Sequence, residues 1–332
     1  MMRRYALLAG LACAAALLAG AGGAPGALSG LADQAGRRVF PALRASDALV
    51  EAGQETTLEA GIGSGIKQEG LQDKRIQFTL DEALLGEVRT DAAGKAALKW
   101  KVPEKPADYR IRARLHPDDQ MPEPVGEVEI FVAARAKDAK IVITDLDRTV
   151  VASGFFSVLA GMAKPMPGAA VVLGRLAKDH TVVYLTHRPD FLAPSSKRWL
   201  TENGFPAGPV LTSTMGTLIS GSGPYKAGRL AAMKKMFPNV LVGIGDKISD
   251  AKVYADNGVR PILIVQPDWS EDEPKKFEEL ADEIAALPES VHVVTNWQQI
   301  DAACFQAAAF PRQDMVKRLR DAALELRRKG KD

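Results

Sequence analysis

Apolar and polar positions alternate with two different rhythms along this chain. From about Asp47 to Arg135 the apolar residues recur at every second position in short runs such as Ile76, Phe78 and Leu80, which is the period of half-buried β-strands. Turn-forming residues separate the runs, and residues 90–94 are expected to close a hairpin between two strands. This pattern predicts an all-β, immunoglobulin-like sandwich over residues 46–135.

From Ala139 onward, short apolar runs alternate with helical segments. The expected strands cover residues 141–143, 181–185, 210–212, 240–244, 261–265 and 291–294, and the expected helices lie near 169–178, 195–203, 227–236, 249–257 and 273–286. Such alternation predicts an α/β domain over residues 138–310, with a doubly wound parallel sheet and helices on both faces. The spacing between the motifs leaves no room for a large cap domain.

The last segment, residues 311–332, is expected to form an amphipathic helix. Its basic polar face could lie on an anionic bilayer, but docking of its apolar face on the preceding domain is the favoured reading. At the other end, Arg3 and Arg4 precede an apolar run to Ala21, which is typical of a signal peptide over residues 1–21. A retained membrane anchor is the alternative.

Residues 22–45 are rich in Gly, Pro and Ala and are expected to be a linker with one short possible helix over 28–43. The signal peptide predicts export to the periplasm, the envelope or the outside of the cell. Cys13 lies in the middle of the apolar run, so a lipid anchor there is disfavoured. If Cys13 is removed with the signal peptide, Cys304 has no partner for an internal disulfide.

Composition narrows the function classes. The chain has 332 residues, of which 46% are apolar and 25% charged, as in ordinary globular proteins. Removal of Arg3 and Arg4 lowers the count of Lys plus Arg from 43 to 41, which equals the 41 Asp plus Glu. A mature chain without net charge shows no sign of a nucleic-acid-binding protein.

An Asp-x-Asp-x-Thr turn follows the apolar run at 141–143. Asp145, Asp147 and Thr149 form this turn at the carboxyl end of a predicted buried strand, where α/β sheets bind their ligands. Two Asp so close would repel each other unless a cation or phosphate chemistry uses them. The alternative is an ordinary pair of Asp residues that caps the next helix.

Three later segments bring further polar residues to the same edge of the sheet. Thr186 ends a strand, Lys226 opens a helix whose dipole disfavours a cation, and Asp246 and Asp250 flank the start of another helix. Each has an ordinary reading as a strand-end Thr, a surface Lys or a helix cap. Together with the first turn they form one constellation.

This constellation suits phosphoryl transfer. Oxygen ligands from Asp145 and the second acidic pair suit Mg²⁺, which binds phosphate oxygens. Asp145 could attack phosphorus to give an aspartyl-phosphate, and Asp147 could protonate the leaving oxygen and then activate water. Thr186 and Lys226 would hold the charge of the phosphoryl group.

The order of these residues resembles the four motifs of the haloacid-dehalogenase-like (HAD) phosphatases. Over about Lys140–Val265 the chain is also similar to the catalytic domain of the lipin-type phosphatidate phosphatases. The matching residues are Tyr184-Leu185-Thr186-His187-Arg188-Pro189, Tyr225-Lys226 followed by Phe237-Pro238, and Gly245-Asp246-Lys247-Ile248-Ser249-Asp250 followed by Tyr254.

The resemblance implies a role for each matched position. Asp145 would be the nucleophile and a metal ligand, Asp147 the acid/base with its backbone carbonyl on Mg²⁺, and Asp246 the next metal ligand with Asp250 close by. Thr186 and Lys226 would contact phosphate. Substrate-binding residues would be Thr149, His187 and Arg188. The departures from the family pattern are Arg148 and His187, which could alter substrate choice.

The sequence therefore predicts an exported, Mg²⁺-dependent phosphatase of phosphatidate or a related lipid phosphate. A phosphatase of soluble phosphomonoesters and a non-catalytic phosphatidate-binding module remain alternatives. Peripheral membrane contact is expected, and Phe155, Phe156, Val158 and Leu159 could touch lipid or pack locally. The β-sandwich carries no cluster of His, Cys or paired carboxylates and is expected to be structural.

Overall fold

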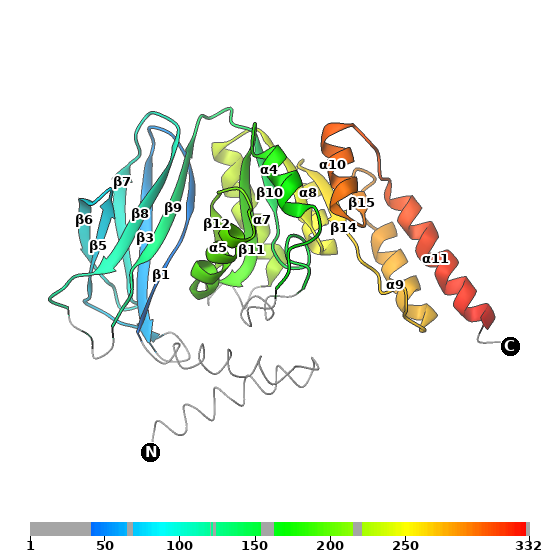
Figure 1. Cartoon of the computed structure of the whole chain (residues 1–332), viewed down its shortest axis with the longest axis horizontal. Coiled ribbons are helices and arrows are strands. Elements are labelled where there is room, and N and C mark those ends of the chain that lie inside the picture. The colour runs from blue at the N-terminus through cyan, green and yellow to red at the C-terminus, as the bar shows by residue number, and fades with distance from the viewer. Residues whose placement is uncertain are drawn as a thin grey trace, which may run out of the picture.

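The computed structural model describes residues 41–64, 69–119, 121, 124–153, 163–214 and 221–329. A β-sandwich and an α/β domain lie side by side, and helices of the C-terminal region extend beyond the α/β sheet (Figure 1). The expected signal peptide, nearly all of the expected linker and the four apolar residues at 155–159 lie outside the described residues. In the part that is described, no helix is both long and apolar enough to cross a membrane.

The sandwich consists of two sheets that share one core. One sheet pairs β3 (Glu55–Ser64) with β1 (Ala42–Ala45), β4 (Glu69–Gly70) and β7 (Lys95–Lys101). The other has the order β2 (Ala48–Glu51), β9 (Val128–Arg135), β8 (Ala107–Leu115), β5 (Arg75–Leu80) and β6 (Ala83–Arg89). Alternate side chains of both sheets, including Leu58, Phe78 and Ile130, are fully buried between them. This confirms a sandwich, while its immunoglobulin-like character stays a prediction.

Two expectations for this region are wrong. Strand β1 begins at Ala42, so the end of the segment expected to be linker and helix is extended and pairs with β3. Residues 90–94 do not close a hairpin, because β6 pairs with β5 in one sheet and β7 pairs with β3 in the other. The turn crosses between sheets: Gly94 has a φ of +70° and accepts a hydrogen bond of 2.8 Å from the Ile62 amide of β3.

The α/β domain contains a six-stranded parallel sheet. Its order is β12 (Val210–Ser213), β11 (Thr181–Pro189), β10 (Ile141–Thr144), β13 (Val240–Gly245), β14 (Arg260–Ile264) and β15 (His292–Val294). All four residues of the central strand β10 are fully buried, which agrees with its continuous apolar run. The predicted parallel sheet is thus confirmed.

Helices cover both faces of this sheet. On one face, α4 (Ala169–Leu176), α5 (Ala193–Glu202) and α10 (Trp297–Phe305) pack against residues such as Val142 and Val182. On the other, α7 (Ser222–Met236) and α8 (Ile248–Asp256) pack against Ile143 and Val183. The short 3₁₀ helix η1 (Asp190–Leu192) links β11 to α5. The most displaced boundary is that of α7, which begins five residues before the predicted start at 227.

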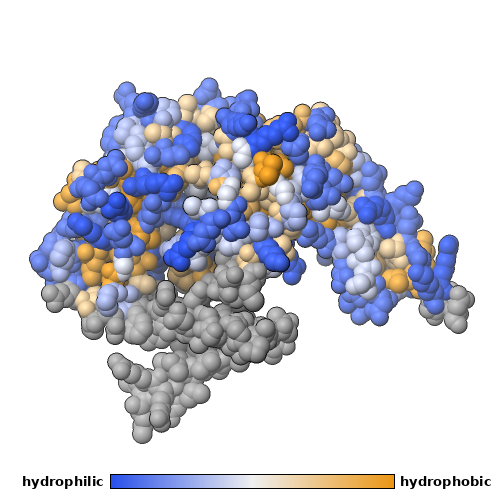
Figure 2. Space-filling model, in the orientation of Figure 1, coloured by the Kyte–Doolittle hydropathy of each residue, from blue (hydrophilic) through white to orange (hydrophobic). Residues whose placement is uncertain are grey.

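The C-terminal helix α11 (Arg312–Lys329) docks on its own domain. Its apolar side chains Met315, Leu319 and Ala323 are buried in a core shared with α9 (Pro274–Ala285). Ion pairs from Arg320 to Asp282 (3.0 Å) and from Arg327 to Glu278 (2.7 Å) flank this contact. The apolar face is therefore covered by protein, and Figure 2 shows mainly hydrophilic residues over the visible surface of this end of the molecule.

The sandwich and the α/β domain share a second hydrophobic core. Leu49 of β2 and Phe131 and Ala133 of β9 pack together with Ile143 and Leu211 of the α/β sheet. The sandwich thus covers part of the sheet face that α7 and α8 leave open. Its structural role, expected from the sequence, includes completing the core of the neighbouring domain.

Asp47 links the two domains through hydrogen bonds. It is 5% exposed and accepts hydrogen bonds from the amides of Phe131 (2.8 Å) and Val210 (2.9 Å), one in each domain. Lys197 of α5 donates to the same carboxylate and to the carbonyl of Glu129 (2.7 Å). Burial raises the pKa of Asp47, and the charge of Lys197 opposes that effect.

We expect Asp47→Asn to lower the free energy of unfolding by about 1–3 kcal/mol. The carboxylate accepts three hydrogen bonds from protein donors, and an amide in its place would turn its NH₂ group toward one of them. Urea unfolding at neutral pH measures the loss. Glu127→Gln is the matched control, because Glu127 is exposed and should change the free energy by less than about 0.5 kcal/mol. Equal effects of the two variants would contradict the role of Asp47.

Candidate active site

Polar residues from three adjacent strands meet at the carboxyl edge of the α/β sheet. Asp145 directly follows β10, Thr186 lies in β11, and Asp246 directly follows β13. The strand registers place Thr144 opposite both Tyr184 and Ile244, so the residues that follow these positions lie side by side. The juxtaposition predicted from the sequence is present.

Three carboxylates form the centre of this site. Oxygen atoms of Asp145, Asp246 and Asp250 all lie within 4.8 Å of one another, and Asp145 is 3% and Asp250 0% exposed. Asp250 belongs to the first turn of α8. A Cβ atom at position 245 would lie 2.7 Å from Asp250 Oδ2, so only glycine lets the carboxylate approach the strand this closely.

Lys226 is buried among these carboxylates. Its Nζ lies 2.9 Å from Asp145 Oδ2 and 2.7 Å from Asp250 Oδ2, and the side chain is fully buried. Burial alone would lower the pKa of Lys226, but the charges of Asp145 and Asp250 raise it well above its usual value. The lysine is therefore a protonated, internal cation, and the reading as a surface lysine is wrong.

The charges and unpaired atoms of the site fit a divalent cation. Three carboxylates surround one ammonium group, which leaves two negative charges uncompensated when all are ionised. Among the described residues, Asp246 Oδ1 and Asp250 Oδ1 are buried without a hydrogen-bond partner, as is the hydroxyl of Tyr254. Hard oxygen donors with unpaired lone pairs are the ligands that Mg²⁺ prefers. Asp145, Asp246 and Asp250 are thus the side chains that could hold it.

The same crowding shows in the titration of the acidic groups. Burial, together with the charges of Asp145 and Asp250, raises the pKa of Asp246 to about 7. Burial also raises the pKa of Asp250 to about 6, although Lys226 opposes the shift. In the protein without metal, ionisation of Asp246 and Asp250 therefore lowers the free energy of unfolding.

We expect the metal-free protein to lose stability as the pH rises from roughly 4 to 7. Unfolded carboxyl groups titrate near pH 4, so in this window the folded protein binds more protons than the unfolded chain. Mg²⁺ binds the ionised form, and it should raise the melting temperature more at about pH 8 than at about pH 5.

Asp246→Asn provides the matched variant for this prediction. With chelator at about pH 8 it should be more stable than the natural sequence, because one buried charge is gone. It should also gain less stability from Mg²⁺. An equal Mg²⁺-induced rise in the melting temperature of both proteins would exclude Asp246 as a ligand.

Asp147 and Arg188 form a pair that the sequence did not predict. Arg188 Nη2 and Nε lie 2.6 and 3.0 Å from the two carboxylate oxygens of Asp147, and Nη1 donates to Ser196 Oγ at 2.8 Å. Arg188 was expected to bind substrate, but in the structure its guanidinium holds Asp147 and is 5% exposed. The Asp147 carboxylate is not part of the three-carboxylate cluster, so a metal contact through its backbone carbonyl stays a prediction.

The other predicted site residues lie around the turn. Thr186 is buried, and its hydroxyl accepts a hydrogen bond of 3.3 Å from the Arg188 amide. The Thr149 hydroxyl is buried and has no hydrogen-bond partner in the described part of the chain, and the ring of His187 lies 5.8 Å from that of Tyr225. Their roles toward phosphate or substrate remain predictions.

Trp297 is a supporting residue that the sequence did not reveal. Its indole N–H donates to the Thr149 carbonyl at 2.8 Å, and the side chain is fully buried. It opens α10, whose preceding Asn296 caps the helix by accepting from the Gln299 amide. Nearly 150 residues separate Trp297 from the turn it anchors, so no local pattern could have indicated the contact.

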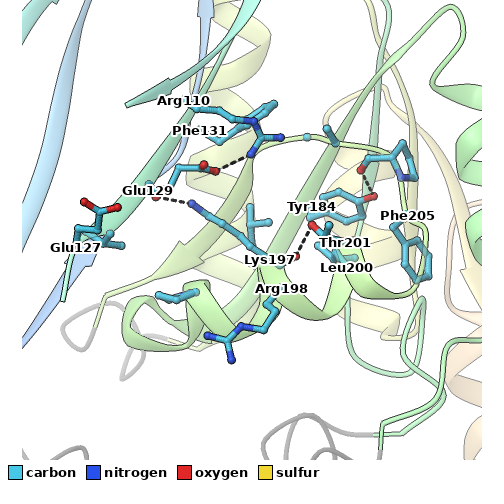
Figure 3. Close-up of a pocket in the computed structure, with 16 residues that line it drawn as sticks. Arg110, Glu127, Glu129, Phe131, Tyr184, Lys197, Arg198, Leu200, Thr201 and Phe205 are labelled. Carbon is cyan, nitrogen blue, oxygen red and sulfur yellow. Dashed lines mark hydrogen bonds and ion pairs between the residues drawn. The ribbon is translucent and has the colours of Figure 1, made fainter. Parts of the chain in front are cut away.

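Two of the hollows in the described part of the chain differ in their relation to the site. A pocket of about 330 Å³ is lined by Asp246 and Arg148. A cleft of about 420 Å³ lies between the sandwich and α5, away from the carboxylates. Figure 3 shows this cleft, in which Arg110 pairs with Glu129 (2.8 Å) and Lys197 reaches the Glu129 backbone. Its charged groups largely satisfy one another, so we assign it no ligand.

Residues 142–265 match the LNS2 domain. The matching family model is described as "PITM 1-3, LNS2 domain", and the matched segment runs from β10 to just beyond β14. It contains Asp145, Asp147, Thr186, Lys226, Asp246 and Asp250. The match supports the assignment of this region to the HAD-like phosphatases. No curated protein matches the chain.

Solved structures resemble separate parts of the chain. A chain of the Pnkp1/Rnl/Hen1 RNA repair complex has 15% sequence identity and a TM-score of 0.36, and the match covers 40% of this chain and 45% of that one. A putative HAD-like phosphatase from Mesorhizobium loti has 13% identity and a TM-score of 0.35, covering 56% and 88%. The D0–D1 domain of Intimin has 20% identity and a TM-score of 0.18, covering 26% and 45%.

These TM-scores are too low to support an inference about fold or function. The matches to the RNA repair complex span only about half the length of the solved chains, at 45% and 55%.

Proposed function

We propose that the α/β domain is a Mg²⁺-dependent phosphatase that hydrolyses a phosphomonoester through an aspartyl-phosphate. We further propose phosphatidate or a related lipid phosphate as its substrate. The observation that carries the proposal is the cluster of Asp145, Asp246 and Asp250 beside the buried Lys226, with unpaired oxygens at the carboxyl edge of a parallel sheet. The LNS2 match over the same residues supports it.

Each residue has a defined task in this reaction. A carboxylate oxygen of Asp145 attacks phosphorus while the bond to the leaving oxygen breaks, and Asp147 gives that oxygen a proton. Asp147 then takes a proton from water, the water oxygen attacks the aspartyl-phosphate, and inorganic phosphate and free Asp145 result. When bound, Mg²⁺ neutralises charge on the phosphoryl oxygens.

Lys226 and Arg188 orient these two aspartates. Lys226 keeps the Asp145 carboxylate fixed and contributes positive charge beside the phosphoryl site, at 2.9 Å from the nucleophile. Arg188 holds Asp147 through two hydrogen bonds and is itself fixed by Ser196. Both aspartates are present and held in place, which favours an enzyme over the non-catalytic binding module.

The lipid substrate rests on a different argument. The lipin-type resemblance of residues 140–265 implies it, and the spacing of the motifs leaves no room for a large cap over the site. A site without such a cap is accessible to a phosphate at a membrane surface. The pocket of about 330 Å³ beside Asp246 favours a soluble phosphomonoester as the second candidate, because its size suits a small leaving group.

Phosphate release by the full chain tests these proposals. The substrates are phosphatidate in mixed detergent micelles and a panel of water-soluble phosphomonoesters, each with Mg²⁺ and with excess chelator. Mg²⁺-dependent release that prefers the lipid is the expected result. Equal or faster release from soluble esters would replace the lipid by a soluble substrate, and retained binding to phosphatidate vesicles without any release would leave only the binding module.

We also propose that residues 1–21 direct the chain out of the cytosol and that peripheral contact with a membrane brings it to its substrate. The basic start and the apolar run of that segment support export. N-terminal sequencing of protein recovered from cells tests the first point. Chains that begin at Met1 or Met2 would show that the segment is kept.

A further inference from the structure

A pocket adjoins the carboxylate cluster on the side of β14. It has a volume of about 330 Å³, and its walls include Ile248, Ile264, Val265 and Leu280. Ile248 and Leu280 are half-buried, so they give the wall of the pocket an apolar part. Asp246, one of the three clustered carboxylates, lies in its wall and connects it to the reaction site. A group in this pocket would therefore be next to a phosphate bound at the cluster.

Arg148 is the one cation among the residues described as lining this pocket. It stands between Asp147 and Thr149, and the described part of the chain offers it no ion pair or hydrogen bond. Arg188, which also lies at the site, already has a partner because it holds Asp147. Arg148 is exposed and is free to meet a ligand in the pocket.

The backbone at Arg148 is strained. Its φ is +54°, a left-handed conformation that glycine adopts without strain and that a long side chain resists. Within the described residues, no ion pair or hydrogen bond of the side chain offsets this strain. Strain at a position one residue from the proposed acid/base is a sign of function rather than of folding. We therefore expect glycine to be more stable at this position than the arginine that the chain has.

We propose that this pocket receives the leaving group of the phosphomonoester and that Arg148 pairs with a second anionic group on it. The proposal rests on the phosphatase function proposed above and narrows its substrate class. The preferred substrate then has a phosphomonoester and, a few bonds away, a carboxylate or a phosphodiester. Guanidinium groups bind both of these through paired hydrogen bonds. Ile248 and Leu280 in the wall contact the carbon atoms between the two charged groups.

Matched pairs of substrates test this on the full chain with Mg²⁺. The soluble pair is 3-phosphoglycerate and glycerol 3-phosphate, which differ by a carboxylate on the leaving group. The lipid pair is phosphatidylglycerol phosphate and phosphatidate, which differ by a phosphodiester. In at least one pair we expect a kcat/KM at least about tenfold higher for the member with the second anion, which corresponds to one good charged contact. Faster turnover of the soluble pair would indicate a soluble substrate, and faster turnover of the lipid pair would indicate a lipid.

Arg148→Gln should abolish this preference, and Arg148→Lys should keep part of it. Arg148→Gly should abolish it too while raising the melting temperature, since glycine relieves the positive φ. A loss of preference in a more stable protein cannot result from unfolding. Arg198→Gln is the control, because Arg198 is an exposed arginine on α5 in the interdomain cleft and should leave the preference unchanged.

The outcomes separate this inference from the phosphatase itself. Phosphate release without preference in either pair, or a preference that Arg148→Gln leaves intact, overturns the role of Arg148 while the phosphatase stands. No release from these four substrates or from the panel of soluble phosphomonoesters overturns the proposed phosphatase, and the inference with it.

Discussion

Asp145→Asn will abolish phosphate release and leave the fold intact. The amide has the shape of the carboxylate but cannot form an acyl-phosphate, so we expect a loss of turnover on the order of 10⁴-fold or more. The oxygen of the new amide can still accept the hydrogen bond that the Leu146 amide donates to Asp145 Oδ1 at 2.8 Å. Lys226 keeps its ion pair with Asp250. The free energy of unfolding should therefore change by less than about 2 kcal/mol.

Phosphate release under single-turnover conditions and urea unfolding of the same preparation measure these two effects. Asp138→Asn is the matched control, because Asp138 lies just before β10, at the opposite end from Asp145, and is exposed. It should keep full activity. Turnover by Asp145→Asn within about a hundredfold of the natural protein would assign the nucleophile to another group.

Lys226→Met will lower the free energy of unfolding by about 3–5 kcal/mol in the presence of chelator. Methionine fills the space of the lysine stem, but it leaves the buried carboxylates of Asp145 and Asp250 without the only ammonium that the described residues place between them. Removal of one partner from a buried ion pair leaves an uncompensated charge, which destabilises far more than a lost surface contact. The loss should be smaller at low pH, where the carboxylates take up protons.

A double-mutant cycle tests the origin of this loss. Lys226→Met combined with Asp250→Asn should recover part of the stability, because the second change removes one of the unpaired charges. Lys252→Met, at an exposed position of α8, serves as the control and should change the free energy of unfolding by less than about 0.5 kcal/mol. A loss below about 1 kcal/mol for Lys226→Met would mean that the carboxylates do not depend on the lysine.

The sequence predicted those parts of the molecule that local patterns determine. Strand β10 is apolar on both faces and ends in two aspartates, so both its burial and its position at the sheet edge could be inferred. Parallel strands end at a common edge, and this rule was enough to bring Asp145, Thr186 and Asp246 together. Lys226 and Asp250 could be placed near them, but the burial of Lys226 could not.

The features that escaped prediction depend on contacts between distant residues. The pairing of Arg188 with Asp147 joins residues 41 positions apart, and Ser196 of α5 holds the guanidinium from a further element. The turn at 90–94 has ordinary hairpin residues, and only the pairing of β7 with β3 shows that it crosses between sheets. The core shared by Phe131 and Leu211 joins two segments whose periodicities indicate separate domains.

This shared core has a consequence for the order in which the chain is made. All strands of the sandwich have been synthesised once Arg135 has emerged, yet its outer apolar residues Leu49, Phe131 and Ala133 pack against residues that follow, up to Val259. Until then the nascent sandwich presents a hydrophobic patch to its surroundings. The Asp47 carboxylate also lacks two of its hydrogen-bond donors, Lys197 and the Val210 amide, until these residues have been synthesised. The sandwich can therefore reach its final packing only after the α/β domain has been synthesised.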